Sequence, residues 1–314
     1  MAVTQTGRIV LLGVARSGTT WLASAMGYAR STRVVREPDN VDADPQGRAV
    51  GRMGFGPYPI IDRGTDSPQF RALWDVSFSG RVPNRRGARR AAGMVMRRLP
   101  RALREPLFRR TARTLAALPG RAPHVVVKST YGIFAIDWLL DNYGPRVVVL
   151  QRHPLNVIAS WVDVGIHGFD LLDRPLIRER FLDPLGIAPL PRDASQLEIV
   201  AEWVGLLAFV LSQQVARHPE WLVVTHEDLC VDPPVRIRSV CEQLGLEWTE
   251  AADGFVRDSN RPGEGFSQFR RFSDLPERWR QRFSDDEIVR IEAVLRRFPS
   301  AGWVRGPAAV APDR

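Results

Sequence analysis

The sequence predicts an α/β protein in which an open, parallel β-sheet is flanked by helices. Short apolar runs rich in β-branched residues recur along the chain, and they are continuous, which is typical of parallel strands buried on both faces. Helical patterns separate these runs, and such alternation of strand and helix favours the α/β class. The strands are expected at Arg8–Gly13, Arg33–Arg36, His124–Lys128, Arg146–Gln151 and Trp221–Thr225.

Residues typical of helix boundaries place several helices between and after these strands. The first helix is expected over Thr20–Ala29, and Pro154 suits the first turn of another. Two later helices begin with a capping box, in which a Ser is followed three residues later by a Glu. These pairs are Ser195 with Glu198 and Ser284 with Glu287.

We expect residues 1–314 to form a single domain, with residues 39–75 and 81–121 as insertions on the substrate side. The Gly/Pro/Asp-rich stretch Asp39–Ser67 predicts a long loop. The second insertion contains the amphipathic, Arg-rich stretch Arg85–Arg113. This stretch fits a solvated helix face, or a surface that touches an acidic substrate, a membrane or nucleic acid.

Composition excludes several protein classes. The 314 residues are 44% apolar, which excludes intrinsic disorder, and the two cysteines can form neither a disulfide framework nor a spaced metal site. The net charge is +9, and Lys128 is the only lysine among 44 basic residues. The apolar stretch Ile199–Leu211 is too short to span a bilayer and predicts a core helix. With no targeting segment visible, we expect a cytoplasmic protein without a transmembrane segment.

The most informative segment is the glycine-rich turn GVARSGTTW at residues 13–21. A strand followed by a turn and a helix start directs backbone N–H groups and the positive end of a helix dipole at one point, which forms an anion site. Compared with the nucleotide triphosphate loop G-x-x-x-x-G-K-[ST], the lysine position holds Thr19, and Arg16 supplies the basic charge. The turn therefore predicts a phosphate loop, but not a typical ATPase or GTPase.

A second segment, QRHPLNVIAS at residues 151–160, also favours phosphate binding. Arg152 ends a strand, and Ser160 lies two turns further along the next helix on roughly the same ridge. An Arg and a hydroxyl so placed suit a second phosphate group. The alternative is an Arg that only pairs with a neighbouring carboxylate.

Together the two segments resemble the nucleotide motifs of the sulfotransferases that use 3′-phosphoadenosine 5′-phosphosulfate (PAPS). GVARSGTTW resembles their 5′-phosphosulfate loop. QRHPLNVIAS is similar to their 3′-phosphate motif, in which an Arg is followed eight residues later by a Ser. THEDL at residues 225–229 and the Arg-Arg stretch before Trp279 resemble two further family segments more loosely. The loop is closest to the branch of the family with R-S-G-T-T loops.

The resemblance implies a sulfotransferase fold, with PAPS as co-substrate, adenosine 3′,5′-bisphosphate (PAP) as product, and no metal. It also implies which residues bind the donor. These are Arg16, Ser17, Gly18, Thr19 and Thr20 at the 5′-phosphosulfate, Trp21 stacked on the adenine, and Arg152, Ser160 and either Arg270 or Arg271 at the 3′-phosphate.

The resemblance further implies three catalytic residues. Lys128 ends the third strand, where the family commonly has a lysine near the transferred sulfuryl group. Thr130 occupies the position at which the cytosolic branch has its histidine base, so the base must come from elsewhere. Glu37 follows the second strand, where the R-S-G-T-T branch places a Glu. We expect Arg16 and Lys128 to stabilise charge on the leaving group and Glu37 to take the acceptor proton; otherwise Glu37 is a surface or Arg-paired carboxylate.

The acceptor is expected to be a hydroxyl of a small molecule or other acceptor, and sugar, lipid, phenol and peptide hydroxyls all stay open. Its pocket is expected in the loops Asp39–Asp75 and Gly165–Pro191, whose aromatic residues are Phe55, Tyr58, Trp74, Phe169 and Phe181. One alternative is a P-loop small-molecule kinase, which Thr19 and the lack of a clear Mg²⁺-binding Asp disfavour. Another is a basic nucleic-acid-binding module, which leaves the phosphate motifs unexplained. We expect no nucleic-acid partner. A peripheral contact through Arg85–Arg113 and the oligomeric state stay open.

Overall fold

The computed structural model describes residues 7–40, 57–80, 100, 110, 123–166, 172–261 and 277–299. Four features predicted from the sequence lie wholly or largely outside these residues. They are the loop Asp39–Ser67, the Arg-rich stretch 85–113, the pair Arg270 and Arg271, and the aromatic residues Phe55 and Phe169.

The strands form a five-stranded parallel sheet in the order β2-β3-β1-β4-β5. The register runs in parallel from Gly7 opposite His124 to Leu12 opposite Ser129 between β1 and β3. All five strands lie where the continuous apolar runs predicted them, so the predicted fold class is confirmed. Their bounds are β1 Gly7–Leu12, β2 Thr32–Arg36, β3 His124–Ser129, β4 Arg146–Gln151 and β5 Leu222–Thr225.

Helices connect and follow the strands within the described residues. The α-helices are α1 Thr19–Met26, α3 Pro68–Phe78, α6 Ile136–Tyr143, α7 Pro154–Asp163, α8 Pro175–Ile177, α9 Gln196–Arg217, α10 His226–Val231, α11 Pro233–Gln243, α12 Glu250–Asp258, α13 Arg278–Arg282 and α14 Asp285–Leu295. Shorter turns are the 3₁₀ helices η2 Gly132–Ala135 and η4 Asp183–Leu185 and the π-helical turn η3 Arg178–Leu182.

Contacts divide the chain into two compact units. Unit 1 consists of Met1–Gly13, Thr19–Val148 and Pro234–Arg257. Unit 2 consists of Val14–Gly18, Val149–Pro233 and Asp258–Arg314. The turn after β1 and the segment after β4 both belong to unit 2.

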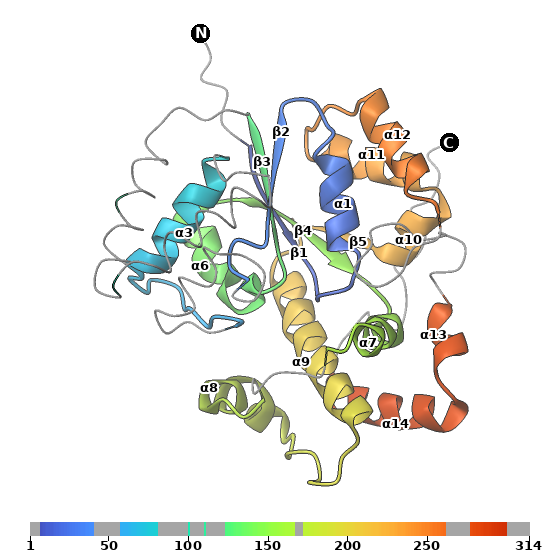
Figure 1. Ribbon diagram of the computed structural model, residues 1–314. Helices are drawn as coiled ribbons and strands as arrows, with labels where there is room; N and C mark the ends of the chain where they lie inside the picture. The colour runs from blue at the N-terminus through green and yellow to red at the C-terminus, as the bar shows by residue number, and fades with distance from the viewer. Residues whose placement is uncertain are drawn as a thin grey trace. The chain divides into compact units, whose positions relative to one another are not determined.

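In unit 1, β1, β2 and β3 are covered by helices on both faces. Helix α1 packs against these strands, and α3 packs against β3 from the other side (Figure 1). The core is apolar, and Phe70, Leu73, Trp74 and Trp138 are fully buried. Pro68 stands in the first turn of α3, a position where its missing N–H costs nothing. Helix α3 was not predicted, and it shows that the expected loop ends at Ser67.

In unit 2, the long helix α9 packs against α7 and α14 (Figure 1). Its 22 residues are long and apolar enough to cross a membrane by length and composition, but 72% of its most apolar window is buried. It begins with the capping box of Ser195 and Glu198, and α14 begins with that of Ser284 and Glu287, both as predicted.

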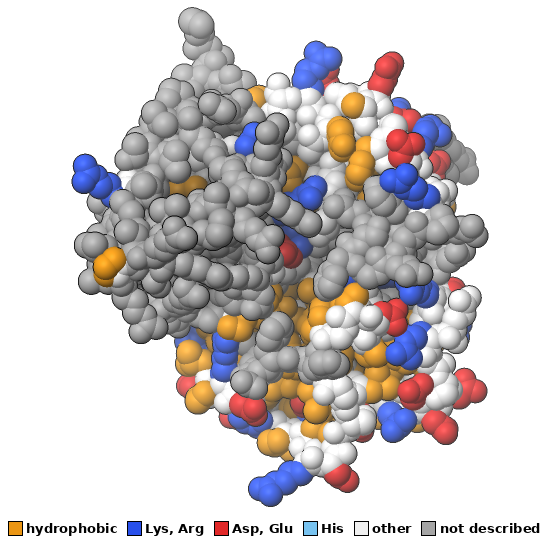
Figure 2. All heavy atoms as spheres, viewed as in Figure 1, with side chains coloured by type: hydrophobic (Ala, Val, Ile, Leu, Met, Phe, Trp, Pro, Cys, Tyr) orange, Lys and Arg blue, Asp and Glu red, His pale blue; other side chains and the backbone are white. Residues whose placement is uncertain are grey.

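Arginine side chains of the described surface are interspersed with acidic ones on the face drawn in Figure 2. Within the described residues several arginines form ion pairs, such as Arg257 with Asp253 at 2.6 Å and Arg278 with Asp163 at 3.1 Å. The charge of these arginines is matched locally, which differs from the basic stripe typical of a nucleic-acid-binding surface.

Candidate functional site

The glycine-rich turn after β1 has the backbone of an anion-binding loop. Arg16 and Gly18 both have positive φ, of 73° and 94°, and the Ser17 N–H donates to the Val14 carbonyl at 3.0 Å. Glycine adopts such angles without strain, whereas Arg16 adopts them at a cost. The chain then enters α1 at Thr19.

Contacts within unit 2 join this turn to the segment after β4. Nε of Arg16 donates to Ser160 Oγ at 2.9 Å, and Nη1 of Arg152 donates to the Arg16 carbonyl at 2.9 Å. The Trp161 indole N–H donates to the Ala15 carbonyl at 2.8 Å. Residues about 140 positions apart in the sequence are therefore in direct contact, and the two predicted phosphate motifs form one cluster. In open α/β sheets, ligands bind at such strand ends where the strand order reverses.

Among the described residues, three buried polar atoms of this cluster have no hydrogen-bond partner: Ser17 Oγ, Arg152 Nε and His153 Nδ1. The first two are donors suited to an anion. A buried donor without a partner is costly and usually marks a missing ligand or water. Burial lowers the pKa of Arg152 to about 10, although the nearby Glu227 carboxylate opposes this shift. A phosphate at this point would satisfy both donors and compensate the buried charge, so the residues present fit a phosphorylated ligand.

His226, which the sequence analysis did not assign, closes one side of the turn. A β-carbon at Gly18 would lie 2.5 Å from Cδ2 of the His226 ring, so only glycine fits there. The ring is buried, and burial together with the charge of Arg152 lowers its pKa well below the usual 6.5. His226 is therefore a neutral imidazole at physiological pH. Its place in the THEDL segment is the sequence signal that could have identified it.

Glu227, also unassigned from sequence, fixes the start of α7. Its Oε1 accepts hydrogen bonds from the His153 backbone N–H at 3.1 Å and from Asn156 Nδ2 at 3.3 Å. A carboxylate at a helix N-terminus satisfies unpaired backbone donors and matches the helix dipole. Glu227 therefore orients the segment that carries Arg152.

A second cluster lies in unit 1, at the ends of β2 and β3. Lys128 forms a hydrogen-bonded ion pair with Glu37 Oε1, which also accepts from Thr130 Oγ1 at 3.1 Å. Asn40 Nδ2 donates to the other Glu37 oxygen at 3.1 Å. Burial acts to raise the pKa of Glu37, but the Lys128 charge and these hydrogen bonds outweigh it, and the pKa is lowered. Glu37 is thus an ionised, partly exposed carboxylate in contact with the only lysine of the sequence.

A buried carboxyl, that of Asp39, accompanies this pair. Its Oδ2 accepts a hydrogen bond from Ser129 Oγ at 2.6 Å, and its Oδ1 has no hydrogen-bond partner among the described residues. Burial raises the pKa of Asp39 to about 7. The two carboxyls of this turn therefore differ in protonation near neutral pH, as expected where acid and base roles are separated by environment.

The remaining predicted site residues are placed as follows. Thr19, Thr20 and Trp21 begin α1, where Thr19 and Trp21 are buried. Stacking of Trp21 on adenine stays a prediction. Tyr58 and Trp74, expected in an acceptor pocket, are fully buried in unit 1, Tyr58 against Tyr131 with ring centroids 4.3 Å apart. They are core residues, because apolar rings stabilise the fold more when buried than when lining an open pocket.

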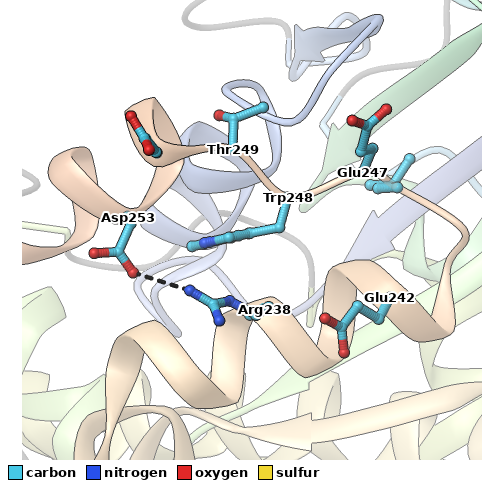
Figure 3. Close-up of a pocket in the computed structure, with 8 residues that line it drawn as sticks. Arg238, Glu242, Glu247, Trp248, Thr249 and Asp253 are labelled. Atoms are coloured by element: carbon cyan, nitrogen blue, oxygen red, sulfur yellow. Dashed lines mark hydrogen bonds and ion pairs between the residues drawn. The ribbon is translucent and has the colours of Figure 1, made fainter.

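Unit 1 also contains a pocket of about 650 Å³ beside α11 and α12, away from the residues predicted from sequence. Figure 3 shows Trp248 next to the Arg238 side chain, which pairs with Asp253 at 3.4 Å. Most of the other polar lining is acidic: Glu242, Glu247 and Glu250. An acidic rim does not suit a phosphorylated nucleotide, so this pocket is not the predicted donor site.

The fold defines the class of this protein: an α/β protein with a P-loop-like parallel sheet and a glycine-containing turn after its first strand. The particular family follows from a comparison of sequences. The model of the Sulfotransferase family matches residues 8–250, so the chain belongs to the sulfotransferase family. No match is found among curated proteins.

Several solved structures resemble the chain at low sequence identity. A sulfotransferase domain from the curacin biosynthetic pathway is 13% identical, with a TM-score of 0.47, covering 92% of this chain and 97% of that one. A sulfotransferase from Alicyclobacillus acidocaldarius is 17% identical, with a TM-score of 0.41 and coverages of 95% and 99%. Retinol dehydratase in a complex with retinol and PAP is 17% identical, with a TM-score of 0.40 and coverages of 94% and 82%.

Proposed function

We propose that this protein transfers a sulfuryl group from PAPS to a hydroxyl of a small-molecule acceptor. Family membership supports the transfer of sulfate. The observation that supports the donor is the contact of Arg16 with both Ser160 and Arg152, because it joins two anion sites within one unit. A nucleotide with phosphate groups at both its 5′ and 3′ positions requires two such sites close together.

The residues of unit 2 bind and orient the donor. Arg152 and Ser160 hold the 3′-phosphate, while Arg16, Ser17 and the backbone at Gly18 hold the 5′ end. The unpartnered donors Ser17 Oγ and Arg152 Nε provide hydrogen bonds that the protein itself does not use. A guanidinium binds phosphate in a fork geometry, and charged hydrogen bonds of this kind are stronger than neutral ones.

Lys128 and Glu37 supply the charge stabilisation and the base. When bound, the donor supplies an activated sulfuryl group, whose transfer resembles phosphoryl transfer through a loose, in-line transition state. For such a transition state, catalysis consists mainly of positioning and of stabilising charge on the leaving group, the role proposed for Arg16 and Lys128. Glu37, ionised at neutral pH, accepts the proton of the acceptor hydroxyl.

The ion pair between Lys128 and Glu37 has a consequence for this base. A carboxylate paired with an ammonium is a weak base, because the positive charge stabilises its ionised form. The pair with Lys128 therefore makes Glu37 a weaker base than an unpaired carboxylate.

Ligand-induced thermal stabilisation tests the donor. PAP should raise the melting temperature more than adenosine 5′-phosphate does, and more than ATP with Mg²⁺, since a ligand that binds only the folded state stabilises it. Equal stabilisation by ATP with Mg²⁺ would favour the kinase alternative. No response to PAP, with steeply salt-dependent binding of duplex DNA, would favour the nucleic-acid module.

Replacement of Arg152 tests the assignment of the 3′-phosphate. Arg152→Ala should weaken PAP binding about tenfold to a hundredfold, the usual cost of a lost charged hydrogen bond, and should weaken adenosine 5′-phosphate binding much less. Arg178→Ala is the matched control in unit 2, because Arg178 pairs with Asp183 near the surface. Equal losses for both nucleotides would show that Arg152 acts only by holding the Arg16 turn and does not bind the 3′-phosphate. Mass spectrometry of sulfonated products from an acceptor library then identifies the acceptor.

A further inference from the structure

A buried hydrogen-bonded chain connects the turn after β2 with the end of β3. Asp39 Oδ2 accepts from Ser129 Oγ at 2.6 Å, and Ser129 Oγ in turn accepts from the Gly132 N–H at 2.8 Å. Asp39 is 4% exposed and Ser129 is fully buried. A β-carbon at Gly132 would lie 3.0 Å from Ser129 Oγ, so the chain is tightly enclosed. Buried polar groups in such an arrangement fix local geometry, because each lost bond leaves an unsatisfied partner.

The turn held by this chain has a strained backbone at Glu37. Its φ is 47°, in the left-handed region that costs a non-glycine residue roughly 1–2 kcal/mol. The Glu37 N–H donates to the Lys128 carbonyl at 2.6 Å, and the Asn40 N–H donates to the Glu37 carbonyl at 3.2 Å. Such strain persists only where the surrounding structure holds it in place, and it is concentrated at functional sites.

We propose that Asp39 is a positioning residue: with Ser129 it braces the turn after β2 against the end of β3 and so holds Glu37 beside Lys128. The proposal rests on the role of Glu37 given above. Asp39 itself touches no substrate in this scheme. It acts through Ser129, which directly follows Lys128, and through Pro38, the one residue that separates it from Glu37.

The protonation of Asp39 suits a brace rather than a second base. Burial raises its pKa to about 7, the hydrogen bond from Ser129 opposes this, and the Glu37 charge raises it further while that of Lys128 lowers it. Below pH 7, Asp39 is therefore largely a neutral carboxyl whose Oδ2 accepts a hydrogen bond. An asparagine accepts the same hydrogen bond through its amide oxygen. Asp39→Asn should therefore preserve the brace, and Asp39→Ala should remove it.

The only lysine provides a direct test that does not need activity. Protein labelled with ¹⁵N-lysine gives a single side-chain signal, that of Lys128. At pH 6, Asp39→Ala and Ser129→Ala should shift or broaden this signal, because the turn with Glu37 is released. Asp39→Asn and the surface control Asp66→Asn should leave it as in the wild type. An unchanged signal in both alanine variants would overturn the brace, as would an Asp39→Asn spectrum equal to that of Asp39→Ala.

Kinetics separate positioning from a general loss of stability. Asp39→Ala and Ser129→Ala should lower kcat about tenfold or more while the KM for PAPS stays within about twofold, since small misplacements of a reacting group are costly. Asp39→Asn should keep most of the wild-type kcat at pH 6. Unchanged kcat with a lowered melting temperature would show that Asp39 is only structural. If the wild type transfers no sulfate, the proposed function fails, and the Lys128 signal still decides whether the brace exists.

The pH dependence of stability tests the neutral carboxyl. The pKa of Asp39 is raised from 3.8 in an unfolded chain to about 7, so the folded state binds this proton more tightly. The resulting stability is fully present below about pH 4 and is lost as the pH rises through 7. The side chain of Asp39→Asn cannot ionise. The melting temperature of this variant relative to the wild type should therefore rise by several degrees from pH 5 to pH 8. A difference that stays constant with pH would overturn the assignment of a neutral Asp39.

Discussion

Each unit contains an ion pair with one buried partner, and the two pairs differ in backbone conformation and in the hydrogen bonds of their carboxylates. Lys128 pairs with Glu37 at the strand ends of unit 1, and Arg297 pairs with Glu202 at 2.9 Å in unit 2. Glu202 lies in the middle of the regular helix α9. Glu37 has a left-handed backbone and further hydrogen bonds from Thr130 and Asn40. Both carboxylates thus pair with a cation. Of the two, Glu37 has the strained backbone and the additional hydrogen-bond donors.

The pKa values of the two carboxyls are also shifted in opposite directions. Burial raises the pKa of Glu202 more than Arg297 lowers it, so its carboxylate is only partly compensated. The pKa of Glu37 is lowered despite burial, because several donors favour the charged form. Among the described residues Glu202 has one cationic partner, whereas several donors keep Glu37 ionised, as its proposed role as a base requires. Burial alone would not have separated the two.

Removal of Arg297 should give the largest effect, and it should be on stability. Arg297→Ala leaves Glu202 buried without its cation, which costs about 3–5 kcal/mol of unfolding free energy. The loss should grow from pH 5 to pH 8, since the raised pKa of Glu202 lets it protonate at the lower pH. Chemical denaturation at both pH values measures this.

The neighbouring Arg296 provides the control for that experiment. Its pair with Glu292 is exposed on both sides, so Arg296→Ala should cost no more than about 0.5 kcal/mol. If both variants lost a similar amount of unfolding free energy, burial of Glu202 would not make its ion pair more important for stability than an exposed one.

Replacement of Glu37 should give the next largest effect, and it should be on turnover. Glu37→Gln keeps the shape of the side chain but removes the base, so kcat should fall about a hundredfold, or roughly 2.7 kcal/mol in the barrier. PAP binding, followed by thermal shift, should be nearly unchanged. Glu247→Gln serves as the control, because Glu247 forms an exposed pair with Arg30. A wild-type kcat in Glu37→Gln would remove Glu37 from the mechanism.

The smallest effect is expected at the helix caps of unit 2. Ser284→Ala removes the side chain that accepts from the Glu287 N–H at the start of α14, which typically costs about 1 kcal/mol. Thermal denaturation should detect this, while kcat stays as in the wild type. Ser239→Ala, on the exposed side of α11, is the control and should change neither. A large loss of kcat in Ser284→Ala would link this structural region to catalysis after all.

Much of the fold could be predicted because it depends on local patterns. Continuous Val-rich runs such as His124–Lys128 gave the strands, and capping boxes gave the starts of α9 and α14. The turn after β1 could also be located, because its backbone requires glycine at Gly18; its role in phosphate binding stays a prediction. Helix α3 was missed, although Pro68 and the spacing of Phe70 and Trp74 are compatible with an amphipathic helix.

The parts of the site that were missed depend on tertiary contacts. Asp39 gains its partner Ser129 only when β2 lies beside β3, 90 residues apart in the sequence. His226 and Glu227 act on Gly18 and on the start of α7, which no local pattern connects to them. Burial by distant segments sets the pKa of each group, and a single sequence does not show which segments meet.

The hydrogen bond from Arg152 to the Arg16 carbonyl orders the turn after β1 before any ligand binds. A loop that is already ordered loses less conformational entropy when a ligand binds, so the ligand binds more tightly. Under the proposed function, the residue that binds the 3′-phosphate also orders the turn that binds the 5′ end. A substitution at Arg152 would then remove two contacts at once.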